Sequence, residues 1–228
     1  MPLHHWTSPP PENPFAPSWR VPIYTAEMTD PTINGQIRNL VLSREASLRQ
    51  TIAPIPISGL RDGLTTRWHG FNIFTWPESC MVTFGQFVRR AYLDLLRSAA
   101  VPRRRAYIQG WANVIRTGEK LSPHAHDQGP TSYISGNYCV QAADTATVYY
   151  PPYLYKDAPN PHTALSVSNR PGVLTLFPSG IFHATTANLH SEPRISLAFD
   201  IHLTDEDPLG RRGAEGHHIL FDDHDMNE

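Results

Sequence analysis

The sequence has 228 residues, with 19 Lys and Arg against 21 Asp and Glu and a formal net charge of −2. This length suffices for one domain with its own hydrophobic core, and the near-neutral charge gives no reason to expect a nucleic acid or anionic membrane as partner. The only cysteines are Cys80 and Cys139, which excludes a disulfide framework and a Cys-based zinc site. There is no bilayer-length apolar run and no signal-peptide pattern, so we expect a soluble cytoplasmic protein.

The N-terminal half is predicted to contain an arm and two helices. Residues 1–18 hold six prolines, together with Trp6 and Phe15, which favours an extended arm lying on the domain or reaching a neighbouring subunit of a homodimer. A helix should begin near Pro31, after polar N-cap candidates, because apolar residues recur on one helical face through Val41. A second amphipathic helix is predicted over residues 79–99.

From Pro102 onward the pattern changes to short strands. Runs with a period of two residues predict strands over residues 107–115, 136–141, 145–150, 173–177 and 194–203. The 22 prolines of the chain, about twice the usual share, also favour strands joined by loops. We therefore expect an arm (1–18), a single domain (19–203) with a helical part (19–101) and a β core (102–203), and a polar, acidic tail (204–228).

His124 and His126 are the first candidate metal ligands. Residues i and i+2 of an extended segment point the same way, so the two imidazoles can converge on one ion. Imidazole suits iron, zinc, copper or nickel, so the pair alone does not name the metal, and two unrelated loop histidines remain the alternative. Asp127 points to the opposite side if the chain stays extended.

A second group of candidates surrounds the last two predicted strands. His183 follows the segment Phe177-Pro178-Ser179 at the end of a strand, and Arg194 begins the last strand. Alternation places Arg194 and Ser196 on the same strand face. An inward arginine must be paired, because an unpaired buried cation is costly, and a carboxylate is its natural partner. That carboxylate could come from a ligand or from an internal salt bridge to Asp200 or Glu192.

In this order of motifs the chain resembles the non-haem iron, 2-oxoglutarate-dependent oxygenases with a double-stranded β-helix core. Their pattern is His-x-Asp/Glu, then a distal His, then Arg-x-Ser about ten residues later. More narrowly the chain is similar to a bacterial branch of these enzymes, over about residues 18–203. The matching elements are Trp68-His69, Trp111-Ala112-Asn113-Val114, His124-Ala125-His126, Ser135-Gly136-Asn137-Tyr138, Phe177-Pro178-Ser179…His183 and Arg194-x-Ser196.

The chain departs from the general pattern at the second ligand. His126 stands where a carboxylate is usual, so three neutral histidines would leave more net positive charge on the metal. We expect the triad His124, His126 and His183, with Asp127 as an alternative ligand or as a residue that orients one of the histidines.

The resemblance implies a mainly β fold with flanking helices around a jelly-roll, cupin-like core. It implies catalysis by Fe(II) on the three histidines, with 2-oxoglutarate bound by Arg194, Ser196 and Tyr138, and with O2 as oxidant. The expected reaction is hydroxylation of an unactivated C–H bond of a small molecule or amino-acid-type substrate, with release of succinate and CO2. Desaturation and ring closure, and the identity of the substrate, are left open.

Three residues are weaker candidates for the substrate pocket. Trp111 and Asn113 share a strand face and could line the pocket, although a tryptophan there could equally belong to the core. Tyr149 belongs to an aromatic, proline-containing loop that either closes over the site or lies on the surface.

Two other kinds of protein would fit the same histidines. One is a three-histidine cupin dioxygenase, or a zinc hydrolase or isomerase, that uses no 2-oxoglutarate. The other is a non-catalytic binding protein on the same fold. Arg194 and Ser196 discriminate, because an enzyme without the cosubstrate has no need of a carboxylate clamp at that position.

Overall fold

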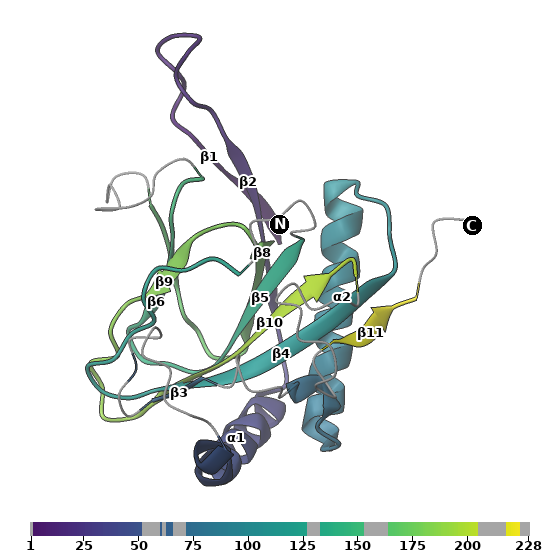
Figure 1. The fold of residues 1–228 in the computed structure, drawn as a ribbon, viewed down its shortest axis with the longest axis vertical. Coiled ribbons are helices and arrows are strands. Elements are labelled where there is room, and N and C mark those ends of the chain that lie inside the picture. Colours follow the sequence, from purple (N-terminus) through teal and green to yellow (C-terminus); the bar gives the residue numbers. More distant parts are fainter. Residues whose placement is uncertain are drawn as a thin grey trace.

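The computed structural model describes residues 2–51, 60, 63–65, 72–126, 133–152, 164–204 and 218–223. Most of this part of the chain is β structure, in two antiparallel sheets with two flanking helices (Figure 1). The elements are β1 (Leu3–Thr7), β2 (Arg20–Glu27), α1 (Pro31–Thr51), β3 (Leu64–Thr65), the 3-10 helix η2 (Ile73–Thr75), α2 (Ser79–Ala99), β4 (Ala106–Ile115), β5 (Ile134–Gln141), β6 (Ala146–Tyr149), β7 (Leu165–Ser168), β8 (Val173–Pro178), β9 (His183–Thr185), β10 (Arg194–His202) and β11 (Ile219–Asp222). The predicted mainly β fold with flanking helices is confirmed.

The large sheet has the strand order β1-β2-β8-β5-β10-β4-β11, with β3 paired to β4, and the small sheet has the order β7-β6-β9. β10 lies between β4 and β5 in the large sheet, and all nine of its residues are buried. Its two faces differ in chemistry. Ile195, Leu197, Phe199 and Ile201 belong to the hydrophobic core, whereas Arg194, Ser196 and Asp200 lie on the other face.

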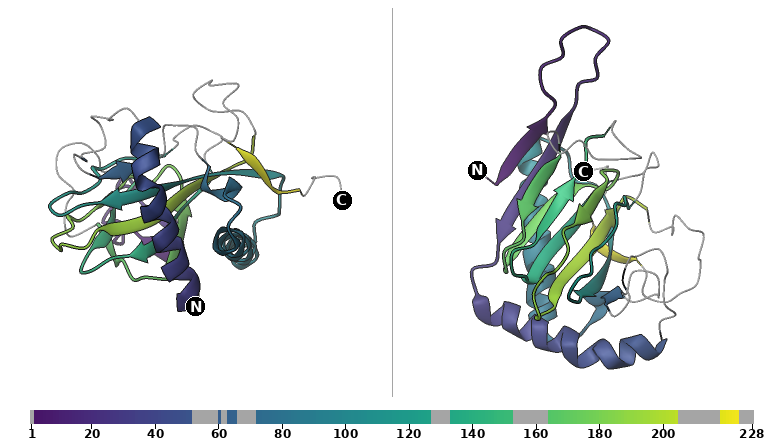
Figure 2. Two further views of the ribbon diagram at one scale, coloured as in Figure 1. Left: turned by 90° about the horizontal axis from the view of Figure 1, so that it is seen from below. Right: turned by 90° about the vertical axis from the view of Figure 1, so that its left-hand side faces the viewer.

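The two helices form where the sequence predicts them. At the start of α1 the backbone N–H of Thr32 donates to the carboxylate of Asp30 (2.9 Å), which caps the helix. α2 buries nine residues, among them Phe84, Val88 and Leu95, against the large sheet. The second view of Figure 2 shows α1 crossing one end of the sheet, roughly perpendicular to α2. No helix in these described ranges is both long and apolar enough to cross a bilayer.

The segment predicted as an arm contains β1, which pairs along its whole length with β2 at the edge of the large sheet. The loop between these strands projects from the molecule (Figures 1 and 2). Trp6 and Trp19 pack edge to face, with 4.5 Å between ring centroids, whereas Phe15 in the connecting loop is exposed. The segment predicted as a polar tail contains β11, which pairs with β4.

Candidate active site

Three histidines from two separate segments meet between the two sheets. Each of His124, His126 and His183 has a ring nitrogen within 4.8 Å of a ring nitrogen of the other two. The shortest distance between their ring centroids is 4.4 Å, from His124 to His183. The imidazoles of His124 and His126 therefore converge on one point, as predicted, and the His183 ring lies at the same point.

Backbone hydrogen bonds hold the two segments together. His124 and His183 form an isolated antiparallel bridge in which each backbone N–H donates to the other's carbonyl, at 2.9 and 2.8 Å. The N–H of His126 donates to the carbonyl of Ser179 (3.1 Å), at the turn between β8 and β9. The extended His-x-His segment is thereby fixed beside β9, and this explains why both of its imidazoles turn toward His183.

The Nδ1 atom of each histidine is directed at an acceptor outside the triad. For His124 the acceptor is the carbonyl of Ser122 (2.7 Å), and for His183 it is the carbonyl of Ile181 (3.0 Å). For His126 it is the carboxylate of Asp200 (2.5 Å), with the Ser135 hydroxyl also close, at 2.9 Å. A proton on Nδ1 satisfies each of these contacts, and the Nε2 lone pair is then available to a metal.

The triad is suited to a transition metal. Burial, followed by the neighbouring His124 and His126, holds the pKa of His183 well below its usual range, so this ring is neutral and can act as a ligand. Three imidazoles suit iron, zinc, copper or nickel. The nitrogens all lie within 4.8 Å of one another, so side-chain rotations that shorten the longest distance could bring them onto one ion with bonds of about 2.1 Å.

Arg194 lies beside the triad and is almost completely buried, with 1% of its surface exposed. The Asn169 amide is best oriented so that both its nitrogen and its oxygen form hydrogen bonds. In this orientation the Asn169 amide oxygen accepts a hydrogen bond from Arg194 Nε (3.3 Å). Within the described part of the chain, Arg194 Nη1 has no hydrogen-bond partner. Burial lowers the pKa of the guanidinium from its usual value. A buried guanidinium that is hydrogen-bonded through one nitrogen and has a second nitrogen without a partner is suited to bind an anion.

The internal salt bridge considered for Arg194 is not present among the described residues. Asp200 is bonded to His126, and Glu192 pairs with Arg38 (3.6 Å) on the surface. The Ser196 hydroxyl, on the same face of β10 as Arg194, is also buried without a hydrogen-bond partner. Both polar groups are therefore buried without a partner in the described ranges, on residues that line one cavity.

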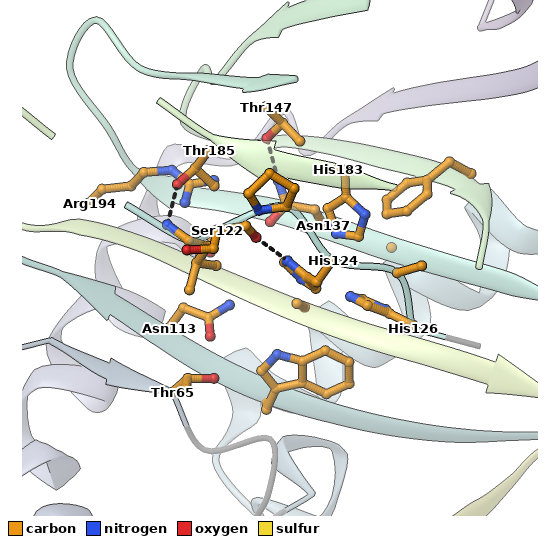
Figure 3. A pocket seen from close by; sticks show the side chains of 18 residues that line it. Thr65, Asn113, Ser122, His124, His126, Asn137, Thr147, His183, Thr185 and Arg194 are labelled. Atoms are coloured by element: carbon orange, nitrogen blue, oxygen red, sulfur yellow. Dashed lines mark hydrogen bonds between the residues drawn. The ribbon is translucent and has the colours of Figure 1, made fainter. Parts of the chain in front are cut away.

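The histidines, Arg194 and Ser196 line one cavity of about 270 Å³. Its walls come from both sheets: β4, β5 and β10 of the large sheet, and β6 and β9 of the small sheet. Figure 3 shows the three histidines together on one side of this cavity, with the Arg194 side chain reaching in from the other. A ligand in the cavity can therefore contact a metal on the triad and Arg194 at once.

Trp111 and Asn113, the weaker pocket candidates, also line the cavity. Trp111 packs against His126, with 5.2 Å between ring centroids, and the Oδ1 atom of Asn113 is buried without a partner. Tyr149 lies behind the cavity, packed on Phe177 and His183, and not on the surface. Its hydroxyl lies near Thr175 without a hydrogen bond of normal geometry.

Tyr138 is not brought together with the other candidates. It points to the α2 side of β5, where its ring packs against Phe84 and Phe87 and its hydroxyl donates to Asn34 Oδ1 (3.0 Å). From this position Tyr138 cannot reach an anion held by Arg194, and this corrects the prediction that it binds the cosubstrate. Asp127, Trp68 and His69 lie outside the described residues.

Sequence reasoning missed the residues that orient the site. Asp200 is the carboxylate partner of His126, and Asn169 holds the guanidinium of Arg194. Asp200 had a usable signal, because it lies at an even spacing from Arg194 and Ser196 on the polar face of β10. Asn169 follows the short strand β7 and had no such signal.

Comparisons with known proteins find a matching family model and similar folds. Residues 109–200 match the model of the protein family described as "Putative 2OG-Fe(II) oxygenase". The fold is similar to that of a Pseudomonas putida prolyl-4-hydroxylase, with a TM-score of 0.59 and 10% identity, covering 80% of this chain and 92% of that chain. It is also similar to the alpha-ketoglutarate-dependent carbocyclase SnoK from nogalamycin biosynthesis, with a TM-score of 0.58 and 10% identity, covering 86% and 88%.

A third similar structure is a viral collagen prolyl hydroxylase from Paramecium bursaria Chlorella virus-1, in complex with 2OG. The TM-score is 0.54 at 10% identity, covering 80% of this chain and 96% of that chain. At such low identity these structures show the fold alone, and they confirm the predicted jelly-roll core. A search of curated protein sequences finds no match.

Proposed function

We propose that this protein uses 2-oxoglutarate and O2 to hydroxylate a C–H bond of a small molecule or amino-acid-type substrate, because residues 109–200 match the model of a 2OG-Fe(II) oxygenase family. His124, His126 and His183 would hold Fe(II). The iron, when bound, supplies the activation of O2 that couples conversion of 2-oxoglutarate to succinate and CO2 with oxidation of the substrate.

One observation carries the proposal: the buried atoms Arg194 Nη1 and Ser196 Oγ have no hydrogen-bond partner among the described residues, and both residues line the same cavity as the triad. 2-Oxoglutarate has a 2-oxo acid group at one end, which chelates a metal, and a second carboxylate at the other end. A guanidinium and a neighbouring hydroxyl are suited to bind that second carboxylate through charge-assisted hydrogen bonds. Asn169 orients the guanidinium from behind.

The same observation argues against the readings that use no 2-oxoglutarate. A three-histidine cupin dioxygenase or a zinc hydrolase on this fold would leave Arg194 Nη1 and Ser196 Oγ buried and unpartnered. This would lower the stability of the folded protein without serving the reaction. We therefore favour the enzyme that binds a dicarboxylate cosubstrate.

Trp111 and Asn113 are the residues that we assign to the primary substrate. The buried Oδ1 of Asn113 can accept a hydrogen bond from an N–H or O–H group, which free amino acids and peptide-like molecules carry. The indole of Trp111 supplies an apolar wall next to His126. We propose hydroxylation as the reaction because two of the similar structures are prolyl hydroxylases; the similar fold of a carbocyclase makes ring closure the alternative outcome.

The test compares two 2-oxo acids that share the chelating group. Under anaerobic conditions, binding of 2-oxoglutarate and of 2-oxobutyrate, which lacks the second carboxylate, is measured on the Fe(II)-loaded protein. The wild type should prefer 2-oxoglutarate by about 10- to 100-fold, the value of a hydrogen-bonded charge pair. Arg194→Ala should abolish that preference and leave 2-oxobutyrate binding unchanged.

Arg103→Ala is the matched control, because Arg103 pairs with Asp222 and does not line the cavity. It should keep the wild-type preference. Equal affinity of the wild type for both acids, or a preference that survives in Arg194→Ala, would contradict the proposed role of the clamp.

A further inference from the structure

The hydrogen bonds behind the triad are not equivalent. The acceptors for Nδ1 of His124 and His183 are backbone carbonyls, which carry no net charge. The acceptor for Nδ1 of His126 is the carboxylate of Asp200, at 2.5 Å. His126 is also the histidine that stands where the general pattern of these enzymes has a carboxylate. The negative charge that the ligand set lacks is thus found one hydrogen bond behind the same ligand.

The strand geometry fixes Asp200 in this position. Asp200 lies on β10 opposite Ser135 of β5 and Gln109 of β4, and its side chain is only 7% exposed. The Ser135 hydroxyl donates to the same carboxylate oxygen (2.5 Å), and its oxygen is also 2.9 Å from the Ser179 hydroxyl. The Ser135 hydroxyl has a single hydrogen. Because it donates this hydrogen to the Asp200 carboxylate, the Ser179 hydroxyl must be the donor in its contact with Ser135. The carboxylate is therefore held by the His126 ring and the Ser135 hydroxyl.

We propose that Asp200 is a positioning residue that acts on the metal through His126, by fixing the Nδ1-protonated tautomer and by supplying the negative charge that a carboxylate ligand would otherwise provide. This inference rests on the proposed function, because it assumes an Fe(II) ion on the triad. A carboxylate that accepts from a ligand imidazole makes that imidazole a stronger donor to the metal. It also favours the more highly charged ferric ion over the ferrous ion.

The two parts of the role can be separated by substitution. Asp200→Asn is almost isosteric, so its Oδ1 can still accept from His126 while the charge is removed. Asp200→Ala removes both the acceptor and the charge. Asp222→Asn is the matched control, since Asp222 is a buried carboxylate paired with Arg89 and Arg103, and neither it nor its partners line the cavity.

The readouts are the anaerobic dissociation constant of Fe(II) alone and the Fe(III)/Fe(II) midpoint potential, both measured without substrate or 2-oxoglutarate on variants whose far-UV circular dichroism matches the wild type. Asp200→Asn should weaken Fe(II) binding by about tenfold or more and move the potential to more positive values. Asp200→Ala should weaken binding further. Asp222→Asn should leave both quantities at the wild-type value.

A wild type that binds Fe(II), together with a folded Asp200→Asn variant of unchanged affinity and potential, would overturn the role of the Asp200 charge and leave the proposed function standing. A wild type that binds no Fe(II) would overturn the proposed function and the role of Asp200 with it. The two failures are therefore distinguishable in one set of titrations.

Discussion

The buried guanidinium of Arg194 destabilises the protein when no ligand is bound, because the side chain is removed from bulk solvent and its Nη1 atom has no hydrogen-bond partner among the described residues. Removing a charge from water without full compensation costs several kcal/mol. A binding site for an anion requires such a group, so stability and binding make opposite demands at this position.

We predict that Arg194→Met raises the free energy of unfolding of the ligand-free protein by about 1–3 kcal/mol, because a well-packed apolar side chain replaces an incompletely paired charge. Urea unfolding of the metal-free protein measures this change. The stabilisation that 2-oxoglutarate gives the Fe(II)-loaded wild type should be absent from the variant. Arg103→Met should instead destabilise, since it removes a partner from the buried Asp222. A ligand-free Arg194→Met protein that is less stable than wild type would contradict this prediction.

At the same scale, the sequence could predict the positions of His124, His126, Arg194 and Ser196, because alternation along an extended segment determines which side chains share a face. It could not place Tyr138. Both faces of β5 are buried, so the pattern does not reveal which face turns toward the cavity. In the structure Asn137 lines the cavity, and its neighbour Tyr138 necessarily points to α2.

At the scale of elements, close packing between the large sheet and its helical layer explains one glycine of the Ser-Gly-x-Tyr motif. A Cβ atom on Gly136 of β5 would lie 2.1 Å from the ring of Phe199 on the neighbouring strand β10. That ring packs edge to face on Phe74 and Phe84 and is completely buried. Gly35, within α1, would place a Cβ in open space.

The same substitution should therefore have opposite effects at these two glycines. Gly136→Ala should destabilise the protein by about 1–3 kcal/mol through overpacking. Gly35→Ala should stabilise it by about 0.5–1 kcal/mol, because alanine loses less backbone entropy in a helix. Chemical denaturation of both variants measures the difference. A Gly136→Ala protein as stable as Gly35→Ala would show that Phe199 can move away.

The elements that the sequence could predict are those with enough residues to show a period. Helix α2 was predicted at its observed bounds, and five strands were predicted within two residues at each end. β9 has three residues and β7 and β11 have four, and these strands were not predicted. β6 also has four residues, but it lies within the longer alternating run 145–150, which made it recognisable. β2 contains Pro22, which lowers the strand signal although Pro22 pairs with His5 at the edge of the sheet.

At the scale of the whole molecule, the site depends on two sheets facing each other. The large sheet contributes Arg194 and Ser196, whereas the small sheet and the segment bridged to it contribute His183 and His124. No local pattern encodes the distance between these groups. The resemblance to a known family implied their proximity, and the cavity that they share gives it a physical basis.

The central claim is that one ligand contacts both a metal on the triad and Arg194. The most direct test adds Fe(II) and then 2-oxoglutarate to the metal-free protein under strict anaerobiosis and records the visible spectrum. We predict a saturable metal-to-ligand charge-transfer band, which is absent from His183→Ala and requires much higher 2-oxoglutarate concentrations in Arg194→Ala. Bound iron without such a band in the wild type would contradict the claim and favour an enzyme that does not use 2-oxoglutarate.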